Sequence, residues 1–393
     1  MYFEISKKEL LNPLKMLIGI VEQRQTLPIL SMALVKVTAG KLDLTANDSE
    51  IELACSLPID TGLDSSQEGE ITLPARKFYD ICRSFSDNAT IQVQSTEPNK
   101  ALVKSGKSRF SLACLPAEDF PNSPDLESVR VFKLPQRTLK RMLKQTSFSA
   151  ATADVRYYLN GVCFHSENST LNMVATDGHR LAFTKELLIN ESDSTEDAVD
   201  ENEAIESPTT NEIGDTFQVI VPRKAVSELA SLLNDSEEEV EISTDDRHIK
   251  FIFSDHLTLI SKLIDGRFPD YAVVIPVNAE KLAVTKGTQL KQALTQAAIL
   301  SNEKFKGVRL AFSENLLTIS GRNPEQEESV IECEIEYNNE SFEIGFNVQY
   351  LLDVLSVIST DEVELHFTDA NSSVLITNRH QDDAKFVVMP MRL

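Results

Sequence analysis

The segment TDGHR at residues 176–180 places a carboxylate and an imidazole two positions apart. These are the side chains of a general acid and the group that orients it, so Asp177 and His179 could serve a hydrolase. Asp-Gly is equally a turn signal, and a turn alone explains the spacing. No nucleophile elbow, phosphate-binding loop or metal-ligand motif accompanies the pair. We therefore predict no catalytic residues, and keep a hydrolase as the weaker alternative.

Cysteine and histidine side chains are scattered along the chain. None of the five cysteines forms a CxxC pair, and the six histidines are equally dispersed. We therefore expect no metal site, no cofactor and no structural disulfide, which fits a reducing cytoplasm. The N-terminal residues lack the pattern of a signal peptide, and no apolar run is long enough for a membrane span.

The C-terminal segment KFVVMPMRL, residues 385–393, is unusually apolar. A free terminus frays into water unless something holds it, and fraying would here expose six apolar side chains. We predict that this segment is a closing strand and that its side chains also belong to a binding site.

The net charge of −23 is distributed unevenly. Residues 190–216 contain ten acidic residues and no basic one, which predicts a solvated, disordered insertion. A segment that binds a partner through its acidic charge is the alternative for this stretch.

Three copies of one pattern follow one another along the chain. Leucine pairs at i, i+4 predict helices at 5–16, 134–145 and 284–295, because that spacing puts both side chains on one helical face. A second trio of helices is expected at 74–84, at 221–233 and after Gly345, and alternating stretches predict antiparallel strands between them. The copies predict an α+β protein with three domains of similar size. Their expected bounds are 1–129, 130–279 (with the acidic insertion) and 280–393.

Basic residues concentrate on the predicted helices. Five of the six helices carry fourteen lysines and arginines against three acidic residues, whereas most of the acid lies elsewhere. A repeated segregation of this kind suits contact with phosphates without reading of bases. We expect one positive surface on an acidic protein.

Several long motifs give the sequence a specific resemblance. In chain order they are RQTLPIL (24–30), PARKFYDICR (74–83), DVRYYLNG (154–161), TDGHRLA (176–182), DGRFPDY (265–271), LSNEKFKGVRL (300–310), NPEQEE (323–328) and the terminal VVMPMRL. Together with the three copies they resemble the sliding clamps of bacterial replication, the beta subunit family of DNA polymerase III.

That resemblance implies a head-to-tail homodimeric ring of six domains, with helices lining the hole. Double-stranded DNA would pass through it without sequence preference, and the ring would tether a polymerase and confer processivity without chemistry of its own. The partners implied are the DNA polymerase III alpha subunit, the clamp loader, and other polymerases and repair proteins. An adaptor that keeps a peptide pocket but does not hold DNA is the alternative from another class.

The resemblance also implies three sets of site residues. In the partner-peptide pocket, methionines offer adaptable apolar surface, and Arg180 and Arg392 are expected to donate at the rim. The pocket set is Leu159, Thr176, Gly178, His179, Arg180, Leu181, Pro269, Val274, Ser373, Val387, Met389, Pro390, Met391 and Arg392. The DNA-contacting set is Arg24, Tyr157, Tyr158, Arg223 and Lys224. The dimer-interface set is Arg76, Lys77, Arg109 and Phe110 on one side, and Ile299, Leu300, Glu325, Glu327 and Glu328 on the other.

One stretch departs from the family pattern. After FPDY the family has two arginines, whereas this chain has Ala272 and Val273. The departure removes two charges near the expected pocket and DNA channel.

Overall fold

The computed structural model describes residues 1–21, 27–38, 40–59, 68–97, 99–123, 126, 130–188, 216–254, 256–277 and 279–392. The acidic segment, apart from Thr216, lies outside the described residues, and so do Arg24 and Leu393.

The described helices and strands repeat one order three times: a strand, a helix, four strands, a helix and three strands. The first copy is β1(Tyr2–Ser6), α1(Lys7–Ile20), β2(Met32–Thr38), β3(Lys41–Asn47), β4(Ile51–Pro58), β5(Gly69–Pro74), α2(Ala75–Ser84), β6(Thr90–Glu97), β7(Lys100–Ser105) and β8(Ser108–Ala113). The second is β9(Arg130–Pro135), α3(Gln136–Thr146), β10(Gly161–Glu167), β11(Thr170–Thr176), β12(Arg180–Leu187), β13(Phe217–Pro222), α4(Arg223–Leu232), β14(Glu239–Thr244), β15(His248–Ser254) and β16(Leu257–Lys262). The third is β17(Lys281–Lys286), α5(Gly287–Ala298), β18(Gly307–Ser313), β19(Leu316–Arg322), β20(Glu328–Glu334), β21(Phe342–Asn347), α6(Val348–Leu355), β22(Glu362–Phe367), β23(Val374–Asn378) and β24(Ala384–Val388). The α+β fold with three copies is confirmed.

The helices begin where local chemistry satisfies their first backbone amides. The Ser6 hydroxyl caps α1 by accepting from the amide of Glu9 at 3.2 Å, and the Asn347 side chain caps α6 by accepting from the amide of Gln349 at 2.9 Å. The predicted leucine pairs are buried in every copy, for example Leu10 and Leu14 in α1. Predicted and observed helix starts differ by no more than three residues.

Two eight-stranded antiparallel sheets combine strands of neighbouring copies. One has the order β5-β2-β3-β4-β16-β15-β14-β9, and the other has the order β13-β10-β11-β12-β24-β23-β22-β17. In both sheets the fourth strand of one copy pairs with the last strand of the next copy: β4 with β16, and β12 with β24. The predicted closing strand is therefore confirmed, since β24 lies between β12 and β23.

The middle copy is divided between two compact units, because each half of its strands belongs to a different sheet. The first unit contains residues 1–137 and 227–263 of the described chain, and the second contains 138–188, 216–226 and 264–392. The three-domain bounds expected from the sequence stay a prediction.

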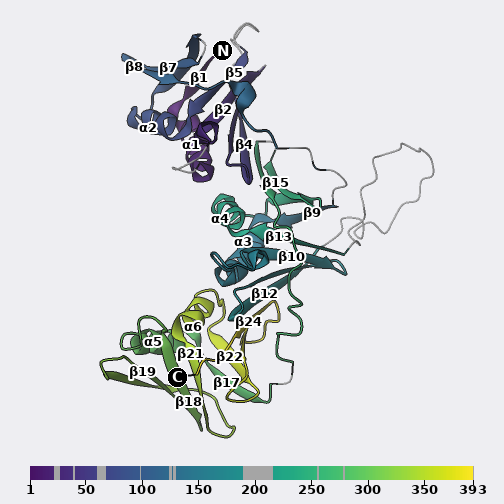
Figure 1. The fold of residues 1–393 in the computed structure, drawn as a ribbon, viewed down its shortest axis with the longest axis vertical. Coiled ribbons are helices and arrows are strands. Elements are labelled where there is room, and N and C mark those ends of the chain that lie inside the picture. Colours follow the sequence, from purple (N-terminus) through teal and green to yellow (C-terminus); the bar gives the residue numbers. More distant parts are fainter. Residues whose placement is uncertain are drawn as a thin grey trace, which may run out of the picture. The chain divides into compact units, whose positions relative to one another are not determined.

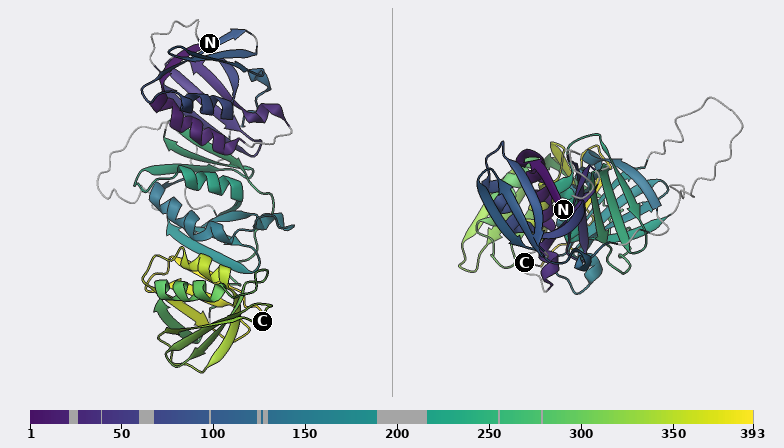
Figure 2. Two further views of the ribbon diagram at one scale, coloured as in Figure 1. Left: turned by 90° about the vertical axis from the view of Figure 1, so that its left-hand side faces the viewer. Right: turned by 90° about the horizontal axis from the view of Figure 1, so that it is seen from above.

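In the first unit α1 and α2 lie side by side, and α1 packs on β3 and β4 (Figures 1 and 2). In the second unit α5 and α6 form a similar pair (Figures 1 and 2). They cover a continuous apolar core that includes Phe312, Phe346 and Phe386. On the opposite face of β24 a smaller core surrounds Val387, where the segment 264–275 covers the sheet.

Two four-stranded sheets complete the described fold, and each ends in an uncovered strand. Their orders are β1-β6-β7-β8 and β20-β19-β18-β21. Most residues of β8 and β20 are exposed or half-buried. Open strand edges of this kind are templates for pairing with another chain.

Candidate functional site

A cavity of about 210 Å³ opens in the second unit on the sheet that contains β24. It lies on the sheet face opposite α5 and α6, which we call the outer face. The turn between β11 and β12, the short helix Tyr157–Leu159, the end of β24 and the segment 268–274 surround it. Its walls are mainly apolar and aromatic, with polar groups at the turn. The lining residues are Arg156, Tyr158, Leu159, Thr176, Gly178, His179, Arg180, Leu181, Phe268, Pro269, Tyr271, Val274, Val387 and Met389.

The floor of the cavity is a row of strand residues. Leu181 on β12 stands opposite Val387 on β24, and both side chains are buried. Phe268 and Leu159 are also buried, whereas Met389 remains 46% exposed. A rigid apolar floor with one adaptable methionine at the opening suits an apolar ligand side chain.

Asp177 stabilises the 176–180 turn through its carboxylate. Its carboxylate accepts from the backbone amides of His179 and Arg180, at 2.9 and 3.0 Å, and from Arg180 Nε at 3.1 Å. Gly178 occupies the turn at φ +87°, a conformation that glycine adopts without strain. The His179 ring stacks on Tyr350, with centroids 6.4 Å apart. Asp177 thus stabilises a turn, and the structure gives the hydrolase alternative no acid–base pair.

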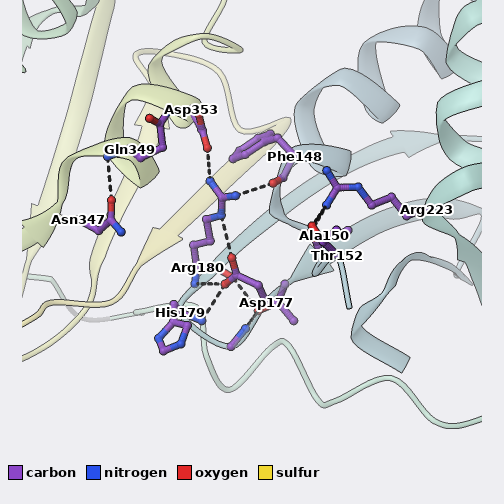
Figure 3. Close-up of polar contacts among 12 residues, drawn as sticks. Phe148, Ala150, Thr152, Asp177, His179, Arg180, Arg223, Asn347, Gln349 and Asp353 are labelled. Atoms are coloured by element: carbon purple, nitrogen blue, oxygen red, sulfur yellow. Dashed lines mark hydrogen bonds and ion pairs between the residues drawn. The ribbon is translucent and has the colours of Figure 1, made fainter. Parts of the chain in front are cut away.

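Arg180 is the centre of a half-buried polar network (Figure 3). Its guanidinium donates to Asp177, to Asp353 of α6 at 2.5 Å and to the Phe148 carbonyl at 2.7 Å. It also lies over the rings of Tyr350 and Phe148, at 4.6 and 5.3 Å from their centroids. Arg180 also lines the cavity, and its expected role as a donor to a ligand at the rim stays a prediction, since these three hydrogen bonds are all made within the protein.

The segment 268–274 forms the outer wall of the cavity, and Tyr271 holds it against the sheet. The Tyr271 hydroxyl lies 2.7 Å from Nδ1 of His165 on β10, and its ring packs against Phe183 with centroids 5.9 Å apart. Burial raises the pKa of Tyr271, so the hydroxyl keeps its proton and can donate.

The structure brings most of the predicted pocket residues together. Ten of the fourteen line the cavity: Leu159, Thr176, Gly178, His179, Arg180, Leu181, Pro269, Val274, Val387 and Met389. Ser373, Pro390, Met391 and Arg392 are not among the lining residues, and the Met391 amide instead donates to the Gly345 carbonyl at 2.8 Å. Sequence reasoning did not place Arg156, Tyr158, Phe268 and Tyr271 there. The motif DGRFPDY contains Phe268 and Tyr271, so this motif could have indicated two of the four residues.

Only some of the residues expected to contact DNA are exposed to solvent. Tyr157 is exposed, whereas Tyr158 lines the cavity. Arg223 donates to the Ala150 carbonyl at 3.0 Å and to the Thr152 hydroxyl at 2.8 Å, so it supports a loop (Figure 3). Lys224 lies next to it in α4. Arg24 lies outside the described residues.

Several helix cations are likewise engaged within the protein. Lys7 is buried and donates to the Phe85 carbonyl and to Asp87. Arg141 pairs with Glu186 and Asp383. Lys286 is the residue before α5 rather than part of it. Fewer of the fourteen cations therefore face solvent than the sequence suggests, but Lys8, Lys15, Lys77, Lys144 and Lys291 are exposed on α1, α2, α3 and α5.

The expected interface residues fall into two groups, each beside an open strand edge. Arg109 and Phe110 lie on β8, with Phe110 packed edge-on against Phe85. Lys77 is exposed on α2, whereas Arg76 donates to the Val21 carbonyl at 2.7 Å. The second group surrounds β20: Ile299 and Leu300 follow α5, Glu325 and Glu327 belong to the preceding turn, and Glu328 begins the strand.

Two further properties concern only the described part of the chain. No group of three or more histidine, cysteine, aspartate or glutamate side chains is arranged to hold a metal ion there. Within the same residues, no helix is both long and apolar enough to cross a membrane.

Comparison with known proteins gives the class first: the chain is similar throughout to DNA sliding clamps. It is 44% identical to the beta sliding clamp of Pseudomonas aeruginosa and 43% identical to that of Escherichia coli K12, over the full length of both chains. Family models of the DNA polymerase III beta subunit match this chain in three parts. The N-terminal domain matches residues 1–124, the central domain 133–200 and 203–270, and the C-terminal domain 272–392. The chain belongs to the DNA polymerase III beta subunit family, and it is a DNA sliding clamp, a processivity factor rather than an enzyme.

Solved structures agree with this assignment. The crystal structure of the Pseudomonas aeruginosa beta subunit matches with a TM-score of 0.90 at 44% identity, and covers both chains completely. A Pseudomonas aeruginosa clamp bound to griselimycin matches with a TM-score of 0.89 at 44% identity, again over both complete chains. A Caulobacter crescentus clamp matches with a TM-score of 0.89 at 32% identity, over all of this chain and 99% of the other.

Proposed function

We propose that two copies of this chain join head to tail into a ring around duplex DNA, and that the cavity beside β24 receives linear peptides of the replicative polymerase and the clamp loader. The single observation that best supports the ring is the joint between copies. Each described joint pairs the fourth strand of one copy with the last strand of the next.

This pairing of the fourth strand of one copy with the last strand of the next leaves two described strands, β8 and β20, without such a partner. Counting along the copies, β20 is the fourth strand of the third copy and β8 is the last strand of the first copy. Pairing β20 of one protomer with β8 of another would repeat the joint and cover both open edges. Because β8 and β20 are different surfaces, the contact is heterologous, and such contacts close into rings when the rotation permits.

Charge supports this pairing. Arg109 is a cation on β8 and Lys77 is an exposed cation of α2, whereas Glu325 and Glu327 precede β20 and Glu328 begins it. Phe110 supplies an aromatic side chain near the centre of the first edge. Opposite charge around an apolar centre favours one partner and one register.

The DNA role rests on weak contacts, which a ring can tolerate. A clamp that encloses DNA needs no tight phosphate binding, and sliding requires that contacts be non-specific. Exposed lysines on the helices suit that requirement, while the acidic exterior discourages DNA from binding elsewhere.

The peptide role rests on the geometry of the cavity. Its apolar floor and the exposed Met389 can take one or two apolar side chains of an extended peptide. We expect griselimycin, which a related clamp binds, to compete for this cavity. Polymerases other than the replicative one and repair proteins are further candidate partners. We also propose a cytoplasmic location, which the free, buried cysteines of the described chain support.

The test is retention on DNA of different topology. The protein is loaded with a clamp loader onto nicked circular duplex DNA, separated from free protein by gel filtration, and followed after linearisation. Retention on circles and release after cutting are expected. Equal retention on both forms would show ordinary binding, and failure to remain on circles while peptides still bind would favour the DNA-free adaptor.

A further inference from the structure

The segment 272–277 forms an exposed apolar strip beside the cavity. Val273 is 78% exposed and Val277 is 88% exposed, and Val274 between them is also exposed. No charged residue lies from Ala272 to Val277. We call residues 272–277 the valine strip.

The valine strip separates two cavities. Val274 lines the cavity of about 210 Å³ described above, while Ile275, Pro276 and Val277 line a second cavity of about 620 Å³ in the same unit. Consecutive residues of one short segment thus face different cavities.

The sheet beneath the valine strip connects the same two cavities. In successive strand pairings Leu181 stands opposite Val387, Val387 opposite Leu375, and Leu375 opposite His366. Leu181 and Val387 form the floor of the first cavity, and Leu375 and His366 line the second. The two cavities therefore lie along one row of the outer sheet face.

The lysines near the second cavity already have partners. The Asp382 carboxylate pairs with Lys185 at 2.8 Å and with Lys385 at 3.1 Å. The Glu364 carboxylate accepts from the Thr377 hydroxyl at 3.5 Å and lies 3.4 Å from His366, which carries a charge only when it is protonated. An acidic ligand residue would therefore meet two carboxylates and no unpaired lysine among the residues that line this cavity, whereas an apolar one would cover exposed valine.

We infer that the valine strip and the second cavity extend the peptide site, and that they select partner peptides with an apolar flank beside the residues held in the first cavity. This inference rests on the proposed peptide function. Its physical basis is that apolar surface on both sides is removed from water, while an acidic flank loses hydration and faces the carboxylates of Glu364 and Asp382. An apolar flank of two residues should tighten binding roughly tenfold.

The test uses twelve-residue fluorescent peptides with a central Leu-Phe pair, chosen because the first cavity is lined by apolar side chains. One peptide has serine at all flanking positions, a second has two valines on one side, and a third has two glutamates there. Each flank is placed in turn before and after the central pair, and affinities are measured by fluorescence anisotropy.

The matched variants change exposed residues only. In one, Val273→Arg and Val277→Arg add two charges to the valine strip. In the control, Leu187→Arg adds charge at the far end of β12, where Leu187 is 68% exposed. The serine-flanked peptide should bind all three proteins alike, and the tenfold gain from valine should disappear only in the double variant.

The outcomes separate the two proposals. If the serine-flanked peptide fails to bind the parent protein, the peptide function itself is wrong. If that peptide binds but valine flanks on either side give no gain, or glutamate flanks bind as tightly, the inference about the valine strip is overturned. A gain that persists in the double variant would overturn it as well.

Discussion

Arg180 shows at the scale of one residue why the type of a side chain does not settle its role. It lies in a motif that predicts a ligand site, yet its three hydrogen bonds and two aromatic contacts all lie within the protein. Two of the partners, Phe148 and Asp353, are distant in sequence, so no local pattern could indicate the direction of the guanidinium. Arg180 holds the turn, β12 and α6 together beneath the cavity.

Replacing Arg180 by methionine should therefore destabilise the protein strongly. The Arg180 side chain is 11% exposed, and its removal would leave Asp177 (17% exposed) and Asp353 (28% exposed) without their cation. The free energy of unfolding should fall by about 2–4 kcal/mol, measured by urea denaturation of the whole protein.

The matched control is Arg309→Met. Arg309 pairs with Glu343 at 2.9 Å, but both side chains are more than half exposed. Its replacement should cost less than about 1 kcal/mol. Equal destabilisation by the two variants would contradict the structural role given to Arg180.

The cysteines give a second residue-scale prediction, because burial suppresses their ionisation. Burial raises the pKa of the Cys55 thiol to about 11 and that of Cys82 to about 12, from an ordinary value of 9.0. At pH 8 the folded protein should react slowly with a disulfide reagent such as DTNB, and all five thiols should react after denaturation.

The same shift fixes the sign of the pH dependence. A thiol whose pKa is raised on folding contributes stability below its unfolded pKa and loses that contribution as pH rises towards the folded value. Unfolding should become easier between about pH 9 and pH 11. Rapid reaction of Cys82 in the native state would show that α2 opens locally.

At the scale of elements, periodicity predicted the repeating parts of the fold and missed the irregular ones. The leucine pairs and alternating strands were sufficient for the helices and sheets, because burial on one face imposes those periods. The segment 264–277 has neither period, so periodicity did not indicate that it would cover the outer sheet face. The motif DGRFPDY indicated part of it, since Pro269 was predicted for the pocket, but the prediction omitted Phe268 and Tyr271 of the same motif.

The C-terminal tail tests the division between strand and site. Deleting Met389 to Leu393 should weaken binding of the Leu-Phe peptide roughly thirtyfold, because it removes Met389 from the cavity lining and one apolar anchor of such a site contributes about 2 kcal/mol. β24 ends at Val388, so the sheet should stay closed. The deletion also removes two backbone hydrogen bonds, from the amides of Met389 and Met391, which should lower the melting temperature only slightly.

Point variants refine this prediction. Met389→Ala should weaken peptide binding, since Met389 lines the cavity, whereas Met391→Ala should have little effect. Anisotropy titration and sedimentation of the same samples separate the possibilities. Unaltered affinity after the deletion would mean that the tail is only a strand, and unfolding would mean that its role is structural.

At the scale of the whole molecule, the open edges of β8 and β20 make the oligomeric state the property to test. We expect a homodimer that Phe110→Ala weakens by removing an aromatic anchor, and that Lys77→Glu with Arg109→Glu weakens by reversing charge. Arg76 is unsuitable for this test because it bonds to the Val21 carbonyl within the same chain. Sedimentation velocity at micromolar concentration measures the result.

Two controls make the dimer prediction specific. Lys41→Glu changes an exposed lysine on β3, away from both edges, and should leave the dimer intact. Adding Glu325→Lys and Glu328→Lys to the charge-reversed protein should restore association. A monomeric parent protein at micromolar concentration would contradict the head-to-tail pairing.

The last prediction concerns where on the molecule DNA lies. Changing Lys8, Lys15, Lys144 and Lys291 to glutamine removes exposed charge from three helices, while Arg223 is left in place because it supports residues 150 and 152. For each lysine that pairs with a phosphate, its replacement should reduce the slope of log K against log salt concentration by about 0.9.

The control changes four exposed lysines of strands and turns, Lys36, Lys41, Lys107 and Lys262, to glutamine, and alters the net charge by the same amount. Both proteins are loaded onto circular DNA, and the salt dependence of their residual DNA binding is compared. A lower slope for the helix variant alone means that DNA contacts the helices. Equal slopes for the two variants would mean that only net charge matters, and that the helices do not face DNA.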